Sequence, residues 1–361
     1  MVIMYLSSLE QVMDCVQLGA ERKFMISQPV VRVVPFQPHC FAFGGFDLQM
    51  IGAMQSAHAA GADIAPLDFW RREADFDVLH LWGLELQHRN TVKWASLAGK
   101  KVLLSALVND PGWKSWLRYI ASYVIGPARL RKPMLAQLDG VTVVNKQQKQ
   151  FLVNTIGFPA EKVFVVPNIV DDIFFAAPKS ADGFELDIDN YVICVGNICR
   201  RKNQLALVKA CRKIGVPLLL VGQVLTGEEE YGRAVDDAMA NDPGIRWIKG
   251  LTPGSVQLAA AYGRAAVFAL PSYGEQQPIS ALEAAAARKP LVLADRPYSK
   301  QEFYANAILA DPNSVDAIAA AISRARDRPD AFCPPDAIIE ECRREKVGAA
   351  YSMIYQKLIH L

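Results

Sequence analysis

The feature that most constrains the fold is an alternation, along nearly the whole chain, between short β-rich apolar runs and longer helical patterns. This alternation is typical of parallel sheets whose strands are joined by crossover helices. The first series of predicted strands covers 30–34, 63–67, 77–81, 102–107, 140–144 and 163–166, and the second covers 191–195, 217–221, 245–248, 266–270, 291–294 and 307–309. One core rarely serves 361 residues, so the two series predict two α/β domains.

The domain boundary is predicted near residues 176–183, where small, polar and helix-breaking residues gather. We therefore expect an N-terminal domain over 1–175, a C-terminal domain over 176–340 and a terminal helix over 341–361. In that helix Val347, Tyr351, Ile354, Tyr355 and Leu358 form one apolar stripe. The stripe could pack against either domain.

Composition excludes several classes of protein. With 52% hydrophobic and 21% charged residues the chain is not disordered, and 39 Lys+Arg against 37 Asp+Glu gives no cationic excess for nucleic acid. The seven cysteines lack paired spacings, so we expect no disulfide framework or zinc site, and a reducing cytoplasm. No apolar run reaches 18 residues, so no segment is expected to span a membrane. Glu10 and Asp14 interrupt the apolar N-terminus, which we therefore expect to be a helix rather than a signal peptide.

Residues 268–285 place two carboxylates around a predicted helix N-terminus. Pro278 suits the first helical turn, so Glu275 would lie in the preceding loop and Glu283 on the second turn. The free N–H groups of a helix N-terminus bind anions, and a carboxylate accepts two hydrogen bonds from a diol such as ribose. The pattern predicts a site for a phosphate and a sugar. The alternative is a solvated loop charge and a surface helix residue.

The same stretch carries a family resemblance. Its Pro-Ser-x-x-Glu-x7-Glu pattern, followed by an Ala-rich helix, resembles the signature of family-4 (group 1) retaining glycosyltransferases of the GT-B fold. Segments 165–171, 191–203 and 219–222 resemble other family motifs in the correct order, with Ile169 where glycine is usual. The resemblance covers about residues 140–320. It implies two Rossmann-like domains facing a central cleft, with the acceptor on the first and the donor on the second.

The resemblance also implies roles for single residues. In the family the second glutamate holds the nucleotide ribose, here Glu283, and the first approaches the donor sugar, here Glu275. Lys202 matches the lysine that contacts the donor diphosphate, so Glu275 and Lys202 are the catalytic candidates. The neighbouring candidates for donor binding are Gly196, Asn197, Arg200, Arg201, Gln276 and Gln277.

The family's arginine is missing, because Asn197 occupies its place. Arg200 or Arg201 could substitute for it. The alternative for Lys202 and these arginines is a solvated basic turn.

The N-terminal half carries weaker signals. Gly44 and Gly45 resemble the family's Gly-Gly loop, whose amides face the donor diphosphate, although such a pair also forms ordinary tight turns. His80 resembles a family histidine at a strand end, but Trp82 replaces the second histidine of that motif and His80 could be structural. The family's later histidine is absent too. The nearest polar candidates for a sugar or acceptor contact are Asn109 and Asp110.

Residues 111–138 contain no acidic residue but several cations and aromatic rings, which is typical of a membrane-interfacial surface. We expect this part of the acceptor domain to rest on an anionic leaflet. The alternative is that the rings fill core and the cations face water. The residues predicted for the membrane surface are Lys114, Trp116, Arg118, Arg129, Arg131 and Lys132.

The function predicted from these patterns is retaining transfer of a sugar from a nucleotide-sugar to a saccharide acceptor, lipid-linked or part of a cell-surface glycan. The enzyme would be cytoplasmic, peripheral on the inner face of the membrane. The nucleotide-sugar is a substrate, no cofactor or metal is expected, and Asp187-Ile-Asp189 is predicted to be a solvated loop. A non-catalytic GT-B module that binds a nucleotide-sugar or glycan would also explain the missing arginine and histidine. A nucleotide-sugar epimerase of similar two-domain form is a further alternative.

Overall fold

The computed structural model of the protein describes residues 28–41, 44–83, 85–106, 108, 133–240 and 242–360. Several predictions lie outside these residues. They are the N-terminal helix, the polar candidates Asn109 and Asp110, and the whole predicted membrane surface of Lys114, Trp116, Arg118, Arg129, Arg131 and Lys132.

The N-terminal domain is built on a six-stranded parallel sheet with the strand order β2-β1-β3-β4-β5-β6. Its buried strands pack against helices that connect them, among which α2 (Gly45–Ala59), α3 (Arg89–Leu97) and α6 (Lys146–Phe151) are described. The strands are β1 (Val30–Val34), β2 (Asp63–Pro66), β3 (Val78–Trp82), β4 (Lys101–Ser105), β5 (Gly140–Val143) and β6 (Val163–Val165).

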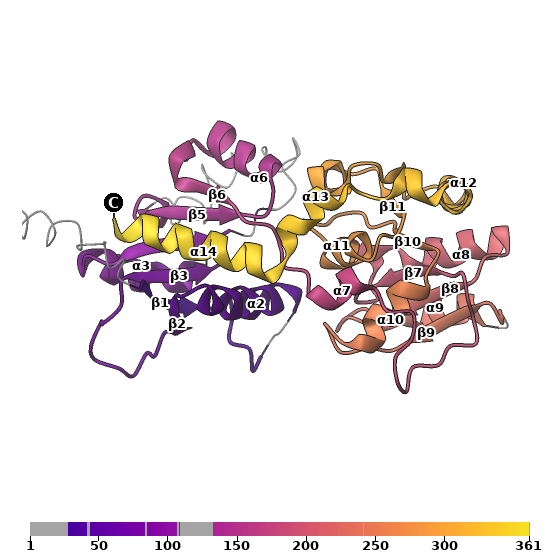
Figure 1. The fold of residues 1–361 in the computed structure, drawn as a ribbon, viewed down its shortest axis with the longest axis horizontal. Helices are drawn as coiled ribbons and strands as arrows, with labels where there is room; N and C mark the ends of the chain where they lie inside the picture. Colours follow the sequence, from indigo (N-terminus) through magenta and orange to yellow (C-terminus); the bar gives the residue numbers. More distant parts are fainter. Residues whose placement is uncertain are drawn as a thin grey trace, which may run out of the picture.

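The C-terminal domain repeats this architecture with the strand order β12-β11-β10-β7-β8-β9. Its strands are β7 (Val192–Val195), β8 (Leu218–Val221), β9 (Ile245–Ile248), β10 (Val267–Leu270), β11 (Leu291–Ala294) and β12 (Ile308–Ala310). Its helices are α7 (Asp172–Ala176), α8 (Gln204–Ile214), α9 (Glu229–Met239), α10 (Val256–Arg264), α11 (Ile279–Ala286), α12 (Val315–Asp327) and α13 (Asp336–Ile339). Figure 1 shows the two domains side by side, joined through the chain around α7.

All twelve predicted runs coincide with strands, within two residues at each end. The agreement has a physical cause. Strands buried on both faces of a parallel sheet have continuous apolar sequences, and most of these strands are buried along their length. The predicted α/β fold with two Rossmann-like sheets is therefore confirmed.

The C-terminal helix α14 (Arg344–Ile359) returns to the N-terminal domain, where it lies against α2 (Figure 1). The predicted apolar stripe is buried in one cluster with Met50, Ala53 and Ala57 of α2; its members are Val347, Tyr351, Ile354, Tyr355 and Leu358. At the start of the helix, Arg344 lies 2.5 Å from the Asp171 carboxylate and Arg343 lies 2.8 Å from Asp172. The terminal helix, for which the sequence left either domain open as a packing partner, therefore packs against the N-terminal domain.

The contact between α14 and α2 depends on a glycine, which gives a prediction for stability. A Cβ at Gly348 would lie 2.3 Å from the carbonyl oxygen of Ser56. Helix propensity alone favours Gly348→Ala by about 1 kcal/mol, but overpacking against backbone costs about 1–3 kcal/mol. We therefore expect Gly348→Ala to lower the melting temperature of the protein.

The matched control is Ala349→Ser, because residue 349 is exposed on the same helix. It should leave the melting temperature nearly unchanged. A Gly348→Ala protein that melts at or above the wild-type temperature would contradict the close approach of the two helices.

Candidate functional site

The loops that follow β7 and β10 meet in a cluster of three charges. These strands are neighbours in the parallel sheet, so their carboxyl ends lie side by side. The Glu275 Oε1 atom lies 2.6 Å from Arg201 Nη1 and 3.2 Å from Lys202 Nζ, and Ser272 Oγ donates to it at 3.0 Å. The side chains of Glu275 and Lys202 are only 11% and 12% exposed. We call Arg201, Lys202 and Glu275 the charge cluster.

The charge cluster keeps Glu275 ionised and retains one excess positive charge. Burial alone would raise the pKa of Glu275, but the attraction of Lys202 and Arg201 outweighs it and lowers that pKa below its ordinary value. Two cations therefore face one carboxylate. Glu275 lies on the loop that leads into α11, and the N-terminus of that helix adds further positive potential. This arrangement is suited to an anion with several oxygen atoms.

Backbone geometry fixes which cations reach the cluster. Gly196 has a φ of +136°, which favours glycine, and a Cβ there would lie 2.8 Å from Lys202 Nζ and displace the end of the lysine. Arg201 also donates to the carbonyl of Gly274 at 2.5 Å, and its own carbonyl accepts from the Tyr273 N–H at 2.8 Å. These bonds join the two loops directly.

Arg200 points away from the charge cluster. Its guanidinium bonds to Glu230 at 2.8 Å, lies 3.7 Å from Glu228 and is 63% exposed. Asn197 is also exposed, and its carbonyl accepts from the Gln204 side chain at 2.9 Å. Of the two arginines that the sequence offered, Arg201 is therefore the one beside Glu275.

Glu283 is buried on α11, with 8% exposure, so it is not a solvated surface residue. The hydroxyl of Tyr262 lies 2.8 Å from its Oε2 atom and 3.1 Å from the carbonyl of Ser280. Burial raises the pKa of Glu283 to about 7; the Tyr262 hydrogen bond opposes this rise and the nearby Asp171 carboxylate adds to it. Glu283 therefore exchanges its proton near neutral pH.

Gly44 and Gly45 face the site from the N-terminal domain. A Cβ at Gly45 would lie 3.5 Å from the Cδ1 atom of Ile279, so the first turn of α2 approaches the first turn of α11. Gly44 has open space where a side chain would lie, and its N–H donates to Asp47 at 2.8 Å. The structure thus brings the Gly-Gly loop to the same domain interface as α11.

The two glutamines after Glu275 have different places. Gln277 is 4% exposed and joins the domains, because its side chain accepts from the Asn168 N–H at 2.8 Å and donates to the Val144 carbonyl at 3.0 Å. Its amide is therefore occupied by protein groups. Gln276 lines a small cleft beside Glu275.

His80 lies in the core rather than at the domain interface. It is 1% exposed, with Nδ1 at 2.8 Å from the Tyr355 hydroxyl and Nε2 at 2.9 Å from Ser105 Oγ. Burial lowers the pKa of His80 to about 3. Both ring nitrogens are satisfied by protein groups beneath α14, which favours the structural interpretation over a contact with a sugar or acceptor.

The Asp187-x-Asp189 segment is a surface loop, as predicted. Asp187 pairs with Arg246, and Asp189 pairs with Arg264 at 2.7 Å. Within the described ranges, no group of three or more His, Cys, Asp or Glu side chains could hold a metal ion. In the same part of the chain, no helix has the length and apolar character needed to cross a membrane.

Three residues near the charge cluster were not predicted from the sequence as site residues. Tyr262 contacts Glu283, while Tyr298 and Gln301 line the small cleft with Glu275. One signal was present for the last two, because they follow β11 and the carboxyl ends of parallel strands share one edge of the sheet. Tyr262 had no local signal, since only the packing of α10 on α11 brings it to Glu283.

The comparisons with known proteins agree with this geometry. Residues 189–327, which begin just before β7 and end with α12, match the family model described as Glycosyl transferases group 1. No curated protein matches the chain in sequence.

Solved structures show the same fold over nearly the whole chain. HepE from Anabaena, in complex with UDP and glucose, has a TM-score of 0.67 at 13% identity and covers 92% of this chain and 100% of its own. A glycosyltransferase from Rickettsia africae has a TM-score of 0.66 at 14% identity, covering 92% and 98%. Sucrose-phosphate synthase from Thermosynechococcus elongatus has a TM-score of 0.62 at 17% identity, covering 92% and 95%. The predicted GT-B architecture is confirmed.

The raised pKa of Glu283 gives a prediction for stability against pH. An unfolded glutamate titrates near 4.5 and the folded one near 7, so only the folded state holds this proton between those values. Its contribution to stability is therefore greatest below about pH 4.5 and is lost as the pH rises to about 7. We expect Glu283→Gln to become more stable relative to wild type as the pH rises from 5 to 8, by roughly 1–3 kcal/mol.

Melting temperatures across that pH range measure the difference. The control is Glu161→Gln, at an exposed glutamate, whose curve should run parallel to wild type. Parallel curves for Glu283→Gln and wild type would contradict a buried, neutral Glu283.

Proposed function

We propose that the chain, whose residues 189–327 match the model of the group 1 glycosyltransferases, transfers a sugar from a nucleotide-sugar donor to a saccharide acceptor. The charge cluster is the observation that carries this proposal. A nucleotide diphosphate gains negative charge as the glycosidic bond breaks, and a fixed cation beside helix N–H groups stabilises that charge. Lys202 and Arg201 provide such cations beside the loop that enters α11.

Glu283 is proposed to hold the ribose of the donor. Tyr262 bonds to its Oε2 atom, while Oε1 has no hydrogen-bond partner among the residues that the structure describes. An ionised carboxylate can accept a hydrogen bond from a ribose hydroxyl at that oxygen. Glu275, fixed by the charge cluster, would then face the donor sugar. That HepE was solved with UDP and glucose supports a nucleotide-sugar donor in a protein of this fold.

The domain interface is proposed as the place of reaction. The Gly44-Gly45 loop at the start of α2 would present the Gly45 N–H to the diphosphate from the side opposite α11, while the Gly44 N–H donates to Asp47. The cations and N–H groups supply charge stabilisation by themselves, so we propose transfer that does not need a metal ion. From the resemblance we propose retention of the anomeric configuration, with the departing diphosphate taking the proton of the acceptor hydroxyl on the same face.

Donor binding tests the charge cluster, and the neighbouring residue Arg200 provides the matched control. In thermal-shift titrations with UDP-, GDP- and ADP-glucose, one donor should stabilise the wild type by about 2.7 kcal/mol at a hundred times its dissociation constant. Lys202→Ala and Arg201→Ala should each weaken binding roughly 10- to 100-fold, the value of a hydrogen bond to a charged group. Arg200→Ala should bind as wild type, because Arg200 pairs with Glu228 and Glu230 instead.

Equal affinities of Lys202→Ala and wild type would refute the proposed phosphate role. If Arg200→Ala lost donor binding and Arg201→Ala kept it, Arg200 and not Arg201 would be the arginine that contacts the diphosphate.

We also propose that the protein acts at the cytoplasmic face of a membrane, on a lipid-linked or growing cell-surface saccharide. The basic aromatic composition of residues 111–138 motivates this, and a described helix adds support. On α3 the side chains of Trp94 and Leu97 are 64% and 75% exposed, next to the exposed Lys93. Exposed aromatic and apolar groups among cations are typical of an interfacial helix.

Sedimentation with vesicles tests the membrane proposal. The protein should sediment with vesicles that contain phosphatidylglycerol, not with neutral phosphatidylcholine vesicles, and should be released at about 0.5 M salt, where screening is strong. Replacing Trp94 and Leu97 together by alanine should weaken sedimentation. The absence of wild-type protein from anionic vesicles at low salt would overturn the proposal.

A further inference from the structure

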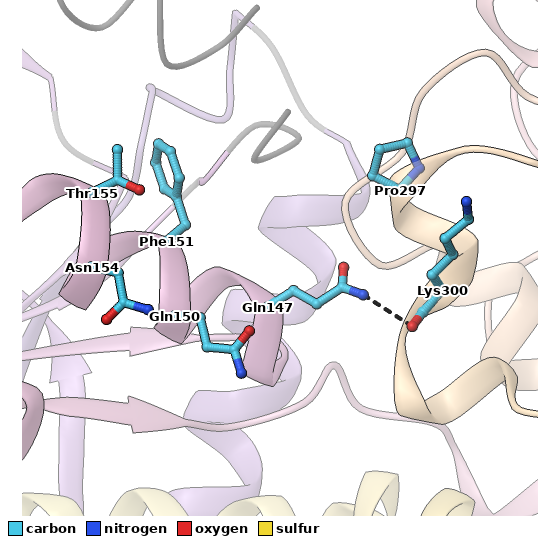
Figure 2. Close-up of a pocket in the computed structure, with 7 residues that line it drawn as sticks. All are labelled: Gln147, Gln150, Phe151, Asn154, Thr155, Pro297 and Lys300. Atoms are coloured by element: carbon cyan, nitrogen blue, oxygen red, sulfur yellow. Dashed lines mark hydrogen bonds between the residues drawn. The ribbon is translucent and has the colours of Figure 1, made fainter. Parts of the chain in front are cut away.

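A second hollow lies at the domain interface, beside the charge cluster. Its volume is about 410 Å³. The N-terminal domain contributes one wall through α6 and the π-helical turn η2 (Leu152–Ile156), and the C-terminal domain contributes the other through η5 (Pro297–Lys300). Figure 2 shows the two walls facing each other. We call this hollow the amide groove; its lining residues are Gln147, Gln150, Phe151, Asn154, Thr155, Pro297 and Lys300.

The described lining of the amide groove sets polar side chains, three of them amides, among apolar surface, and it carries little net charge. Gln147, Gln150 and Asn154 recur at positions i, i+3 and i+7, so they share one face of the helix. Among the lining residues that the structure describes, the one cation is Lys300, which pairs with Asp295 at 3.0 Å. Amides both donate and accept hydrogen bonds, as sugar hydroxyls do, whereas phosphates are bound chiefly through charge-assisted hydrogen bonds from cations. This chemistry favours a neutral saccharide.

The backbone of this wall is unusual. Residues Leu152–Ile156 form a π-helical turn that continues α6 and carries Asn154 and Thr155. Such turns are rare and often occur at functional sites. Here the turn belongs to the segment that lines the groove.

The amide groove leads toward the charge cluster. Gln147 lines both the groove and the small cleft that contains Glu275, Tyr298 and Gln301. Gln301 is 3% exposed, and its amide nitrogen donates to the carbonyl of Gln276. Its Oε1 atom is buried and has no hydrogen-bond partner among the residues that the structure describes. An unpaired buried acceptor is costly, and a hydroxyl of a bound ligand would satisfy it.

We infer that the amide groove is a subsite for uncharged sugar units of the acceptor. The small cleft, with a volume of about 10 Å³, would admit one hydroxyl of the end that approaches Glu275. The inference rests on the proposed glycosyl transfer, because it assigns the second substrate of that reaction to a place. It makes Gln150 and Asn154 specificity residues and Gln301 the inner hydrogen-bond acceptor. Gln147 has a further role, since it donates to the Lys300 carbonyl at 2.9 Å and joins the two walls (Figure 2).

Saturation-transfer difference NMR on the full chain, with UDP present, tests this inference. The probes are maltose, cellobiose and N,N′-diacetylchitobiose, three uncharged disaccharides. At least one should bind the wild type. The double variant Gln150→Ala/Asn154→Ala should bind that disaccharide with an affinity lower by roughly fivefold or more, as expected for two lost hydrogen bonds. Both side chains are exposed, so the variant should fold, which its melting temperature checks.

The matched control is Gln257→Ala, an amide on α10 that bonds to the Asp182 carbonyl away from the groove. It should bind the disaccharide as wild type does. The inference is overturned if no probe binds the wild type or if the double variant binds it equally well. Binding of UDP, GDP and ADP, measured with the same proteins, separates the two proposals. Wild-type protein that binds none of the three would refute the donor site, whereas nucleotide binding without a groove effect refutes only the acceptor subsite.

Discussion

The ion pairing of Glu275 with Lys202 and Arg201 is the interaction on which the site depends. A carboxylate that is 11% exposed is costly to ionise unless cations and hydrogen bonds compensate for lost water. The two cations come from the turn after β7 and the carboxylate from the loop after β10, so the cluster forms only when these strands are neighbours. The order of the strands in the sheet thus fixes the positions of these three charges.

The second constraint is the attachment of the N-terminal domain to this cluster. Gln277, two residues after Glu275, holds Asn168 and the carbonyl of Val144. Ile169, which follows Asn168, donates to the buried Gln49 side chain of α2 at 2.6 Å, and its carbonyl accepts from that side chain at 3.2 Å. This chain of bonds connects the start of α11 to α2 and so relates the Gly-Gly loop to the charge cluster. The return of α14 onto α2 adds a second connection between the domains.

Apolar runs and turn residues predicted the twelve strands, because burial on both faces of a parallel sheet is a local property of the sequence. That Lys202 and Glu275 belong to one donor site was expected only from the family resemblance, and their ion pair was not predicted. Three outcomes depended on tertiary packing and had no local signal. Consecutive arginines in a tight turn point to different partners, His80 is covered by Tyr355, 275 residues away in sequence, and Tyr262 of α10 reaches Glu283 on α11.

The central claim is that the charge cluster holds the diphosphate of a nucleotide-sugar while Glu283 holds its ribose. A crystal structure of the protein with a bound nucleoside diphosphate tests this most directly. The account predicts a phosphate oxygen within hydrogen-bond distance of Lys202 Nζ, backbone N–H groups of α11 directed at the phosphates, and a ribose hydroxyl at Glu283. A nucleotide bound elsewhere, with Lys202 still paired only with Glu275, would contradict it.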